Sequence, residues 1–182
     1  MSGGRVIVLN GASSSGKSSL AAALLEILVG PWTVLAVDDF HNARSRGTWT
    51  EAEFALIMRR TVLGFHRAVA GFASAGNDVI VDHVLSEPWR REDLASQLTG
   101  LSAVLVAVNC PLEELERREA ARGDRPPGLA ARQAALLEGV ESDMVVDTLD
   151  ADPAECADRI QDFMESKAPA VALATLRRDH PT

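Results

Sequence analysis

The stretch from Gly11 to Ser18 contains the residue types that bind a phosphate chain. It reads Gly-Ala-Ser-Ser-Ser-Gly-Lys-Ser and fits the pattern G-x-x-x-x-G-K-[S/T] of a phosphate-binding loop. The two glycines let the backbone turn sharply and bring its N–H groups against phosphate oxygens. Lys17 is expected to reach the β- and γ-phosphates of ATP, and the Ser18 hydroxyl to ligate Mg²⁺. We therefore predict a nucleotide-binding loop formed by Gly11, Ala12, Ser13, Ser14, Ser15, Gly16, Lys17, Ser18 and Ser19.

The residues around this loop agree with that prediction. Residues 5–10 are an apolar stretch that predicts a buried strand, and residues 18–28 are rich in good helix formers. Such a helix points its positive N-terminal end at the same anion. Lys17 is one of only two lysines in the chain, and a compact ammonium suits the space beside the phosphates. The alternative, a glycine–serine turn that carries a lysine by chance, accounts less well for this agreement.

Two aspartates follow predicted strands, at the edge of a parallel sheet where ligands gather. Asp38 comes after the predicted strand 32–37 and is the candidate general base for an acceptor hydroxyl. Asp82 closes the predicted strand 78–82 and is the candidate Mg²⁺ ligand beside Ser18, directly or through water. The alternatives are structural: a helix cap or solvated turn for Asp38, and a strand-end cap for Asp82.

Two arginines lie near a segment that cannot be helical throughout, because residues 122–128 contain two prolines and two glycines. We expect a lid over residues 122–137, in which Arg122 and Arg125 neutralise charge on the transferred phosphoryl group. The alternative is that these arginines only favour the C-terminal end of a helix.

The remaining polar and aromatic residues give weaker signals. Trp49, in the loop expected over residues 40–49, is the tryptophan best placed to line an acceptor pocket. His83 is a candidate substrate contact, although a lone histidine in a loop is more often structural. His41 and His66 form no triad or metal cluster with His83 that the sequence supports.

Composition limits the class of protein. The chain has 182 residues, 47% of them hydrophobic, which favours one globular domain over residues 1–182. The net charge of −8 and the lack of a basic stripe argue against nucleic acid as a partner. The two cysteines lack the spacing of a metal site, and no apolar stretch is long enough to span a membrane. Because the start of the chain also does not read as a signal peptide, we predict a cytoplasmic protein. The sequence leaves open whether the protein forms a homo-oligomer.

Apolar strand-like stretches alternate with helical ones, which predicts an α/β fold with a parallel sheet covered on both faces. Strands are expected at 5–10, 32–37, 78–82, 101–109 and 144–147. The pattern Thr50-Glu51-Ala52-Glu53 predicts a capped long helix that ends near 75–77, and Asp152-Pro153-Ala154-Glu155 predicts the cap of the last helix. Residues 168–182 are weakly patterned and predict a frayed tail.

With these residues placed, the chain resembles the chloramphenicol phosphotransferase family of P-loop kinases over residues 5–163. The resemblance rests on residues 9–18, on Val37-Asp38, and on residues 79–82. Its most specific part is Arg122-Gly123-Asp124-Arg125, continued by Gly128, Ala131, Gln133, residues 138–141, Asp143 and Asp147-Thr148. The chain differs from the family pattern at His83 and Ser142, and its segment after Asp38 is shorter.

The resemblance implies a kinase that moves the γ-phosphate of ATP to a hydroxyl of a small amino-alcohol-type antibiotic. It implies that Asp38 is the base, that Lys17 and Ser18 bind phosphate and metal, and that arginines of residues 122–125 lie in a lid. It also implies a three-layer P-loop fold with a five-stranded sheet, in the strand order of nucleotide and shikimate kinases. The alternatives are a kinase of another metabolite, nucleoside or nucleotide, and a non-catalytic nucleotide-binding regulator. A GTPase is disfavoured, because the chain has no Asn-Lys-x-Asp motif.

Overall fold

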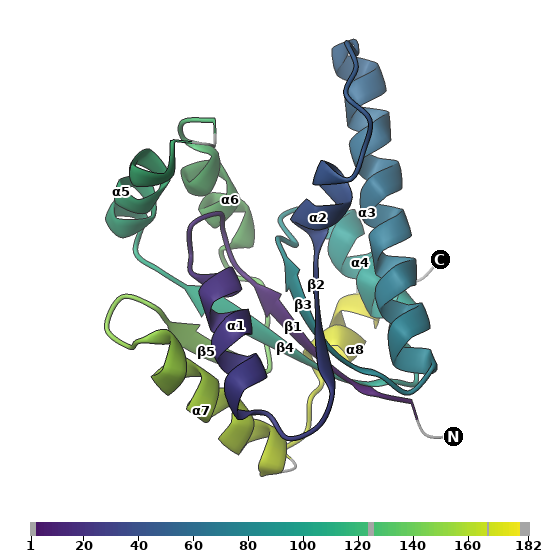
Figure 1. Cartoon of the computed structure of the whole chain (residues 1–182), viewed down its shortest axis with the longest axis vertical. Helices are drawn as coiled ribbons and strands as arrows, with labels where there is room; N and C mark the ends of the chain where they lie inside the picture. Colours follow the sequence, from purple (N-terminus) through teal and green to yellow (C-terminus); the bar gives the residue numbers. More distant parts are fainter. Residues whose placement is uncertain (1–2, 124–125, 167, 179–182) are drawn as a thin grey trace.

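The computed structural model describes residues 3–123, 126–166 and 168–178. The strands are β1 (Arg5–Asn10), β2 (Trp32–Ala36), β3 (Asp78–His83), β4 (Ser102–Asn109) and β5 (Met144–Asp147). The helices are α1 (Lys17–Ile27), α2 (Val37–Asn42), α3 (Glu51–Ser74), α4 (Pro88–Gln97), α5 (Leu112–Arg122), α6 (Leu129–Leu137), α7 (Pro153–Glu165) and α8 (Ala172–Arg178). Figure 1 shows how these elements surround a central sheet.

The five strands form one parallel sheet in the order β2-β3-β1-β4-β5. Strand β1 lies at its centre, where Asn10 pairs with His83 of β3 and with Ala107 of β4. The carboxyl ends of the strands therefore meet at one edge of the sheet, below the loop that follows β1 (Figure 1). The predicted α/β fold and the strand order of nucleotide and shikimate kinases are confirmed.

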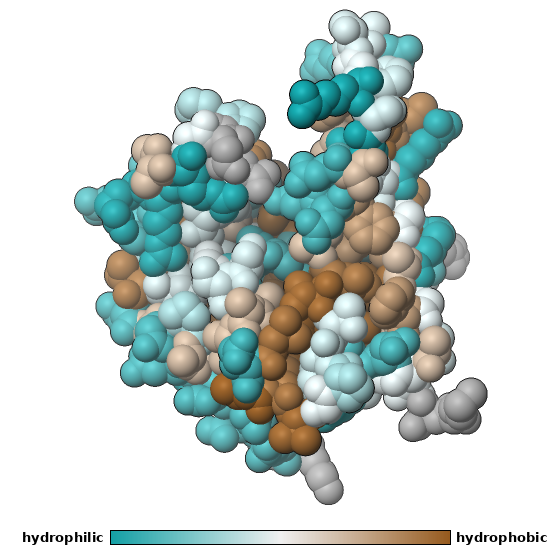
Figure 2. Space-filling model, in the orientation of Figure 1, coloured by the Kyte–Doolittle hydropathy of each residue, from teal (hydrophilic) through white to brown (hydrophobic). Residues whose placement is uncertain are grey.

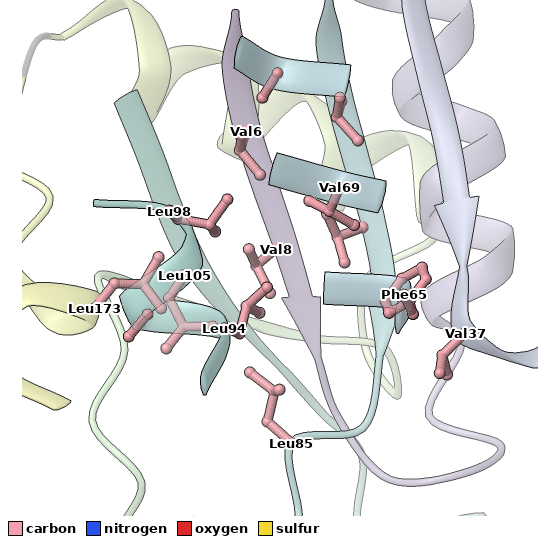
Figure 3. Close-up of a cluster of buried hydrophobic side chains, with 14 of the residues drawn as sticks. Val6, Val8, Val37, Phe65, Val69, Leu85, Leu94, Leu98, Leu105 and Leu173 are labelled. Carbon is pink, nitrogen blue, oxygen red and sulfur yellow. The ribbon is translucent and has the colours of Figure 1, made fainter. Parts of the chain in front are cut away.

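Two separate cores fill the spaces between the sheet and its helices. On one face, side chains of α3, α4 and α8 pack on β1, β3 and β4, with Phe65, Leu94 and Leu173 among them (Figure 3). On the other face, α1 and α7 pack on the sheet through residues such as Leu20 and Ile160. Side chains of a strand alternate between the faces, so Val79 and Val81 enter the first core and Ile80 the second. The same alternation determines which face of the sheet each polar side chain at the end of a strand points to.

Local signals account for the helix boundaries. The Thr50 hydroxyl accepts from the Glu53 N–H while the Glu53 carboxylate accepts from the Thr50 N–H, which makes the predicted capping box of α3. The same reciprocal pair, Asp152 and Glu155, begins α7. Helix α5 ends at Gly123, whose φ of 67° is a left-handed conformation that glycine adopts without strain.

Two helices form where the sequence predicts irregular structure. Residues 37–42 form α2 rather than the start of a loop, because Phe40 packs edge-on against Phe65 with ring centroids 5.1 Å apart. Residues 172–178 form α8 inside the segment predicted to be frayed. The carboxylate of Asp143 accepts from the N–H groups of Val171 and Ala172, and Leu173 is buried in the core. Both helices depend on contacts with distant residues, which a local pattern does not reveal.

No helix among the described residues is long and apolar enough to cross a membrane.

Candidate active site

The loop between β1 and α1 has the backbone shape that a phosphate-binding loop requires. Gly16 has a φ of 91°, a conformation that side chains disfavour, and it precedes the first turn of α1. A Cβ on Gly11 would lie 2.5 Å from the carbonyl oxygen of Val108, so only glycine fits there. The Lys17 ammonium is largely buried and donates to the carbonyl oxygen of Ala12 at 2.8 Å. The lysine is thereby folded back along the loop.

The end of β3 brings a carboxylate to the start of α1. The Ser18 hydroxyl donates to Asp82 Oδ2 at 2.7 Å, although 64 residues separate the two in sequence. Asp82 points to the α1 face of the sheet because it lies two residues after Ile80. A hydroxyl and a single carboxylate suit Mg²⁺, which keeps several waters and takes other ligands from phosphates. Among the described residues no group of three or more histidine, cysteine, aspartate or glutamate side chains could hold a metal by itself.

A cleft of about 1140 Å³ connects these residues with α2. Its lining includes Lys17, Ser18, Asp82 and the two acids of the first turn of α2, Asp38 and Asp39. Asp38 is partly buried and Asp39 is exposed. In Figure 2 the surface is hollowed between the part built by α5 and α6 and the part built by α2 and α3. The structure thus brings the candidate base, the lysine and the candidate metal ligands into one cleft.

Helix α5 supplies arginines to the other end of the cleft. Arg118 donates to the carbonyl oxygen of Thr148 at 2.8 Å and, with Arg117, pairs with Glu114. These hydrogen bonds lower the pKa of the Glu114 carboxyl to about 2. The Thr148 hydroxyl in turn donates to the carbonyl oxygen of Ser15 at 2.8 Å. Arg118 therefore links α5 to the loop after β5, and Thr148 links that loop to the phosphate-binding loop.

The predicted lid segment contacts the phosphate-binding loop directly. Arg122, at the end of α5, lines the cleft, whereas Arg125 lies outside the described residues. Buried Glu119 accepts from the N–H groups of Gly128 and Ala130, each at 2.7 Å, and so caps the start of α6 from outside. Gln133 of α6 accepts from the N–H of Ser13 at 2.7 Å. Helix α6 is thus held between α5 and the loop, and its action as a lid stays a prediction.

His83 ends strand β3 and contacts His66, so it is not the lone loop histidine that the sequence suggests. His66 of α3 and His83 of β3 are both fully buried, and their Nε2 atoms lie 3.0 Å apart. His66 Nδ1 lies 2.6 Å from Asp93 Oδ2 of α4. The sequence offered one usable signal, because His83 shares the alternation of Val79 and Val81 and must therefore face α3. Trp49 is 48% exposed and is not among the described residues that line the cleft.

Comparison with known proteins agrees with the fold and the loop. The profile of the family described as chloramphenicol phosphotransferase-like protein matches residues 4–165. A Mycobacterium tuberculosis protein, provisionally named an O-phosphotransferase in strains CDC 1551 and H37Rv, is 30% identical over 202 residues. That match covers 96% of this chain and 88% of the relative.

Solved structures share the same fold at low identity. The APS kinase CysC of M. tuberculosis, in complex with AMPPNP and APS, has a TM-score of 0.70 at 20% identity, over 91% of this chain and 99% of that one. The tunicamycin resistance protein of Deinococcus radiodurans has a TM-score of 0.68 at 20% identity, over 88% and 95%. Shikimate kinase of Acinetobacter baumannii, in complex with shikimate, has a TM-score of 0.61 at 15% identity, over 91% and 96%. These likenesses concern the fold.

The family match, the fold and the phosphate-binding loop agree on the class of enzyme, an ATP-dependent small-molecule kinase. The family match spans most of the chain, from residue 4 to residue 165. The chain belongs to the chloramphenicol phosphotransferase-like family.

Proposed function

We propose that the protein transfers the γ-phosphate of ATP to a hydroxyl of a small molecule, most specifically an antibiotic of the chloramphenicol type. The observation that carries the proposal is the shared cleft. Helix α1 brings Lys17 and Ser18 to it, β3 brings Asp82, which contacts Ser18, and α2 brings Asp38. Phosphoryl transfer needs little covalent chemistry from the protein, so catalysis depends on positioning and on charge stabilisation. A lysine, a metal site and a carboxylate around one space provide both.

Each of these residues has a distinct role in the proposed reaction. Lys17 and the N–H groups of the loop hold the β- and γ-phosphates. Ser18 and Asp82 hold Mg²⁺, which when bound neutralises charge on the phosphates. Asp38 orients the acceptor hydroxyl and takes its proton as the new P–O bond forms and the bond between the γ-phosphorus and the oxygen of the leaving ADP breaks. Arg122, and Arg125 if the lid brings it to the cleft, stabilise the charge that develops on the transferred group.

The two ends of the cleft suit different parts of the reactants. The end at α5 and the loop after β5 is lined by Arg118, Leu149 and Pro153, which offer a guanidinium and apolar surface to an adenine ring. We define the acceptor side of the cleft as α2, with Asp38 and Asp39, together with the end of β3 at Asp82 and the following Val84. An acceptor bound there has its hydroxyl beside Asp38 and in reach of the γ-phosphate.

The acceptor is tested by a transfer assay read by mass spectrometry. Purified protein and Mg²⁺-ATP are incubated with a pool that contains chloramphenicol, other hydroxylated antibiotics and nucleosides, and Asp38→Ala serves as the control. A phosphate adduct of chloramphenicol that disappears in the variant supports the proposed acceptor. An adduct on a metabolite or nucleoside keeps the chemistry and replaces the acceptor. ATP binding without any adduct, and equal behaviour of Asp38→Ala, would favour a non-catalytic regulator.

A further inference from the structure

Three buried or nearly buried polar side chains form a continuous array beneath the acceptor side of the cleft. Asp93 of α4, His66 of α3 and His83 at the end of β3 follow one another, with 2.6 Å from Asp93 to His66 and 3.0 Å from His66 to His83. Both imidazoles have no exposed surface, and the Asp93 side chain is 19% exposed. None of the three lines the cleft. The proposed reaction therefore assigns them no contact with either reactant.

The distances fix where the protons of this array lie. His66 Nδ1 faces a carboxylate, which only accepts, so Nδ1 carries a hydrogen and donates it to Asp93. Burial lowers the pKa of His66 although Asp93 opposes this, so His66 is neutral and its Nε2 is a bare acceptor. A hydrogen bond between the two Nε2 atoms then requires that His83 carries its hydrogen on Nε2. Asp93 thus determines the tautomer of His83 through His66.

The far nitrogen of His83 is left as a buried acceptor. His83 Nδ1 is buried and has no hydrogen-bond partner among the described residues. The charged or titratable groups around the two rings are Asp93, Arg67 and Arg90 near His66, and Arg90, His41 and Lys17 near His83. A buried array with one unsatisfied member is less favourable than apolar side chains of the same shape. Stability alone therefore does not explain why polar groups occupy this position.

The array ends at the point of the sheet that presents the candidate metal ligand. His83 and Asp82 are consecutive, so the first points to α3 while the second points to α1 and accepts from Ser18. On the other side of His83, the N–H of Leu85 donates to Asn10 Oδ1 at 2.9 Å. His83 also packs edge-on against Phe65, with ring centroids 5.3 Å apart, and Phe65 supports α2 through Phe40. Figure 3 shows Phe65, Val37 and Leu85 around this end of β3.

We propose that Asp93 and His66 are positioning residues for phosphoryl transfer, which act by fixing His83 and thereby hold the end of β3 and the Asp82 carboxylate in place. This inference rests on the proposed kinase function. Because the array includes the last residue of β3 and contacts α2 through Phe65 and Phe40, its loss displaces the acceptor side of the cleft and leaves the phosphate-binding loop and α5 as they are. Rotating His83 out of its hydrogen bond changes the backbone next to Asp82, and groups that orient a metal ligand typically change activity on the order of 10- to 100-fold when removed.

The tautomers of the two histidines are tested first, in the unmodified protein. Nitrogen NMR of protein labelled with ¹⁵N-histidine distinguishes the two neutral tautomers of each ring. We expect the Nδ1–H form for His66 and the Nε2–H form for His83. The opposite assignment for either ring would overturn the inference, and this measurement needs neither a variant nor an acceptor.

The positioning role is tested with a matched pair of variants at Asp93. Asp93→Asn keeps an oxygen that accepts from His66 Nδ1–H, whereas Asp93→Leu removes it at similar size. With Mg²⁺-ATP and chloramphenicol as the probe acceptor, Asp93→Leu is expected to lower kcat on the order of 10- to 100-fold with an unchanged KM for ATP. Asp93→Asn is expected to restore kcat and the His66 tautomer. Equal kcat in the two variants would show a merely structural role.

Failure of the proposed function gives a different result. In that case the wild-type protein shows both expected tautomers but transfers no phosphate to any acceptor of the pool. The pair Asp93→Leu and Asp93→Asn is then compared in the hydrolysis of Mg²⁺-ATP, with water as the acceptor. A slower Asp93→Leu supports the positioning role without chloramphenicol, and equal rates overturn it.

Discussion

On the nucleotide side of the cleft, the phosphate-binding loop and the start of α1 form one continuous stretch. The acceptor side instead joins α2 with the end of β3, and His66 of α3 and Asp93 of α4 support it from outside the cleft. The loop is closed by a bond between residues close in sequence, from Lys17 to Ala12, although Asp82, Gln133 and Thr148 also contact it from distant parts of the chain. The contacts of His66 with His83 and Asp93 that support the acceptor side join residues 17 and 27 positions apart. We expect the first side to be sensitive mainly at its own residues. The second is expected to respond to substitutions outside the cleft.

The largest effect is expected on the nucleotide side, at Lys17. Replacing Lys17 by alanine removes the charge that we propose holds the β- and γ-phosphates, so turnover is expected to fall on the order of 10³-fold. Steady-state phosphorylation of an acceptor or hydrolysis of Mg²⁺-ATP measures this loss. The matched control is Lys167→Ala, which removes the chain's other lysine. Unchanged turnover in Lys17→Ala would contradict the assignment of the loop.

On the acceptor side, two neighbouring acids of α2 allow a paired test. Asp38→Asn keeps the size of the side chain and removes the proton acceptor, so kcat is expected to fall on the order of 10²- to 10⁴-fold with unchanged affinity for ATP. Asp39 lines the same cleft but is more exposed, and Asp39→Asn is expected to cost much less. The reverse ranking, measured by acceptor turnover and by ATP binding, would move the role of the base to Asp39.

The start of α6, in the predicted lid segment, is held by one carboxylate of α5. Glu119→Ala removes both hydrogen bonds to the start of α6, which is expected to lower the local opening free energy of α6 by about 2 kcal/mol. Hydrogen exchange of the α6 amides measures this opening, and turnover is expected to decrease by a smaller factor than in Asp38→Asn. Glu119→Gln, which keeps one acceptor oxygen, is the control. Unaltered α6 exchange in Glu119→Ala would mean that other contacts hold the helix.

The same contrast explains how much the sequence could predict. The phosphate-binding loop, the capping box at Thr50 and strand β3 depend on residues within a few positions of each other, and their positions follow from local patterns to within one residue. Helix α2 could not be predicted, because Phe40 needs Phe65 to pack against. Helix α8 needs Asp143, and the histidine array needs three elements in register. Each missing feature is a contact between distant residues, and most of them lie on the acceptor side.

The smallest expected effect is on stability, and it again separates the two sides. Burial lowers the pKa of His66 in the folded protein below the value near 6.5 of an exposed imidazole, against the opposing effect of Asp93. Above that value the ring is neutral in both states. As the pH falls below about 6.5 the unfolded chain binds the proton first, so the free energy of unfolding decreases, by at most about 1.4 kcal/mol per pH unit for one ring. The loss continues until the pH reaches the lowered pKa of the folded state.

Urea unfolding of the wild type and of His66→Gln between about pH 7.5 and 5.5 tests this dependence. The variant keeps a polar side chain without an ionisable ring, so its free energy of unfolding is expected to fall less over this range. Amide exchange at the lower pH is expected to show that α3, α4 and the end of β3 open before α1. A charged His66 would be repelled by Arg67 and Arg90 and would lie against His83, whereas the phosphate-binding loop contains no imidazole. Identical pH profiles for the two proteins would remove His66 as a source of the acid sensitivity.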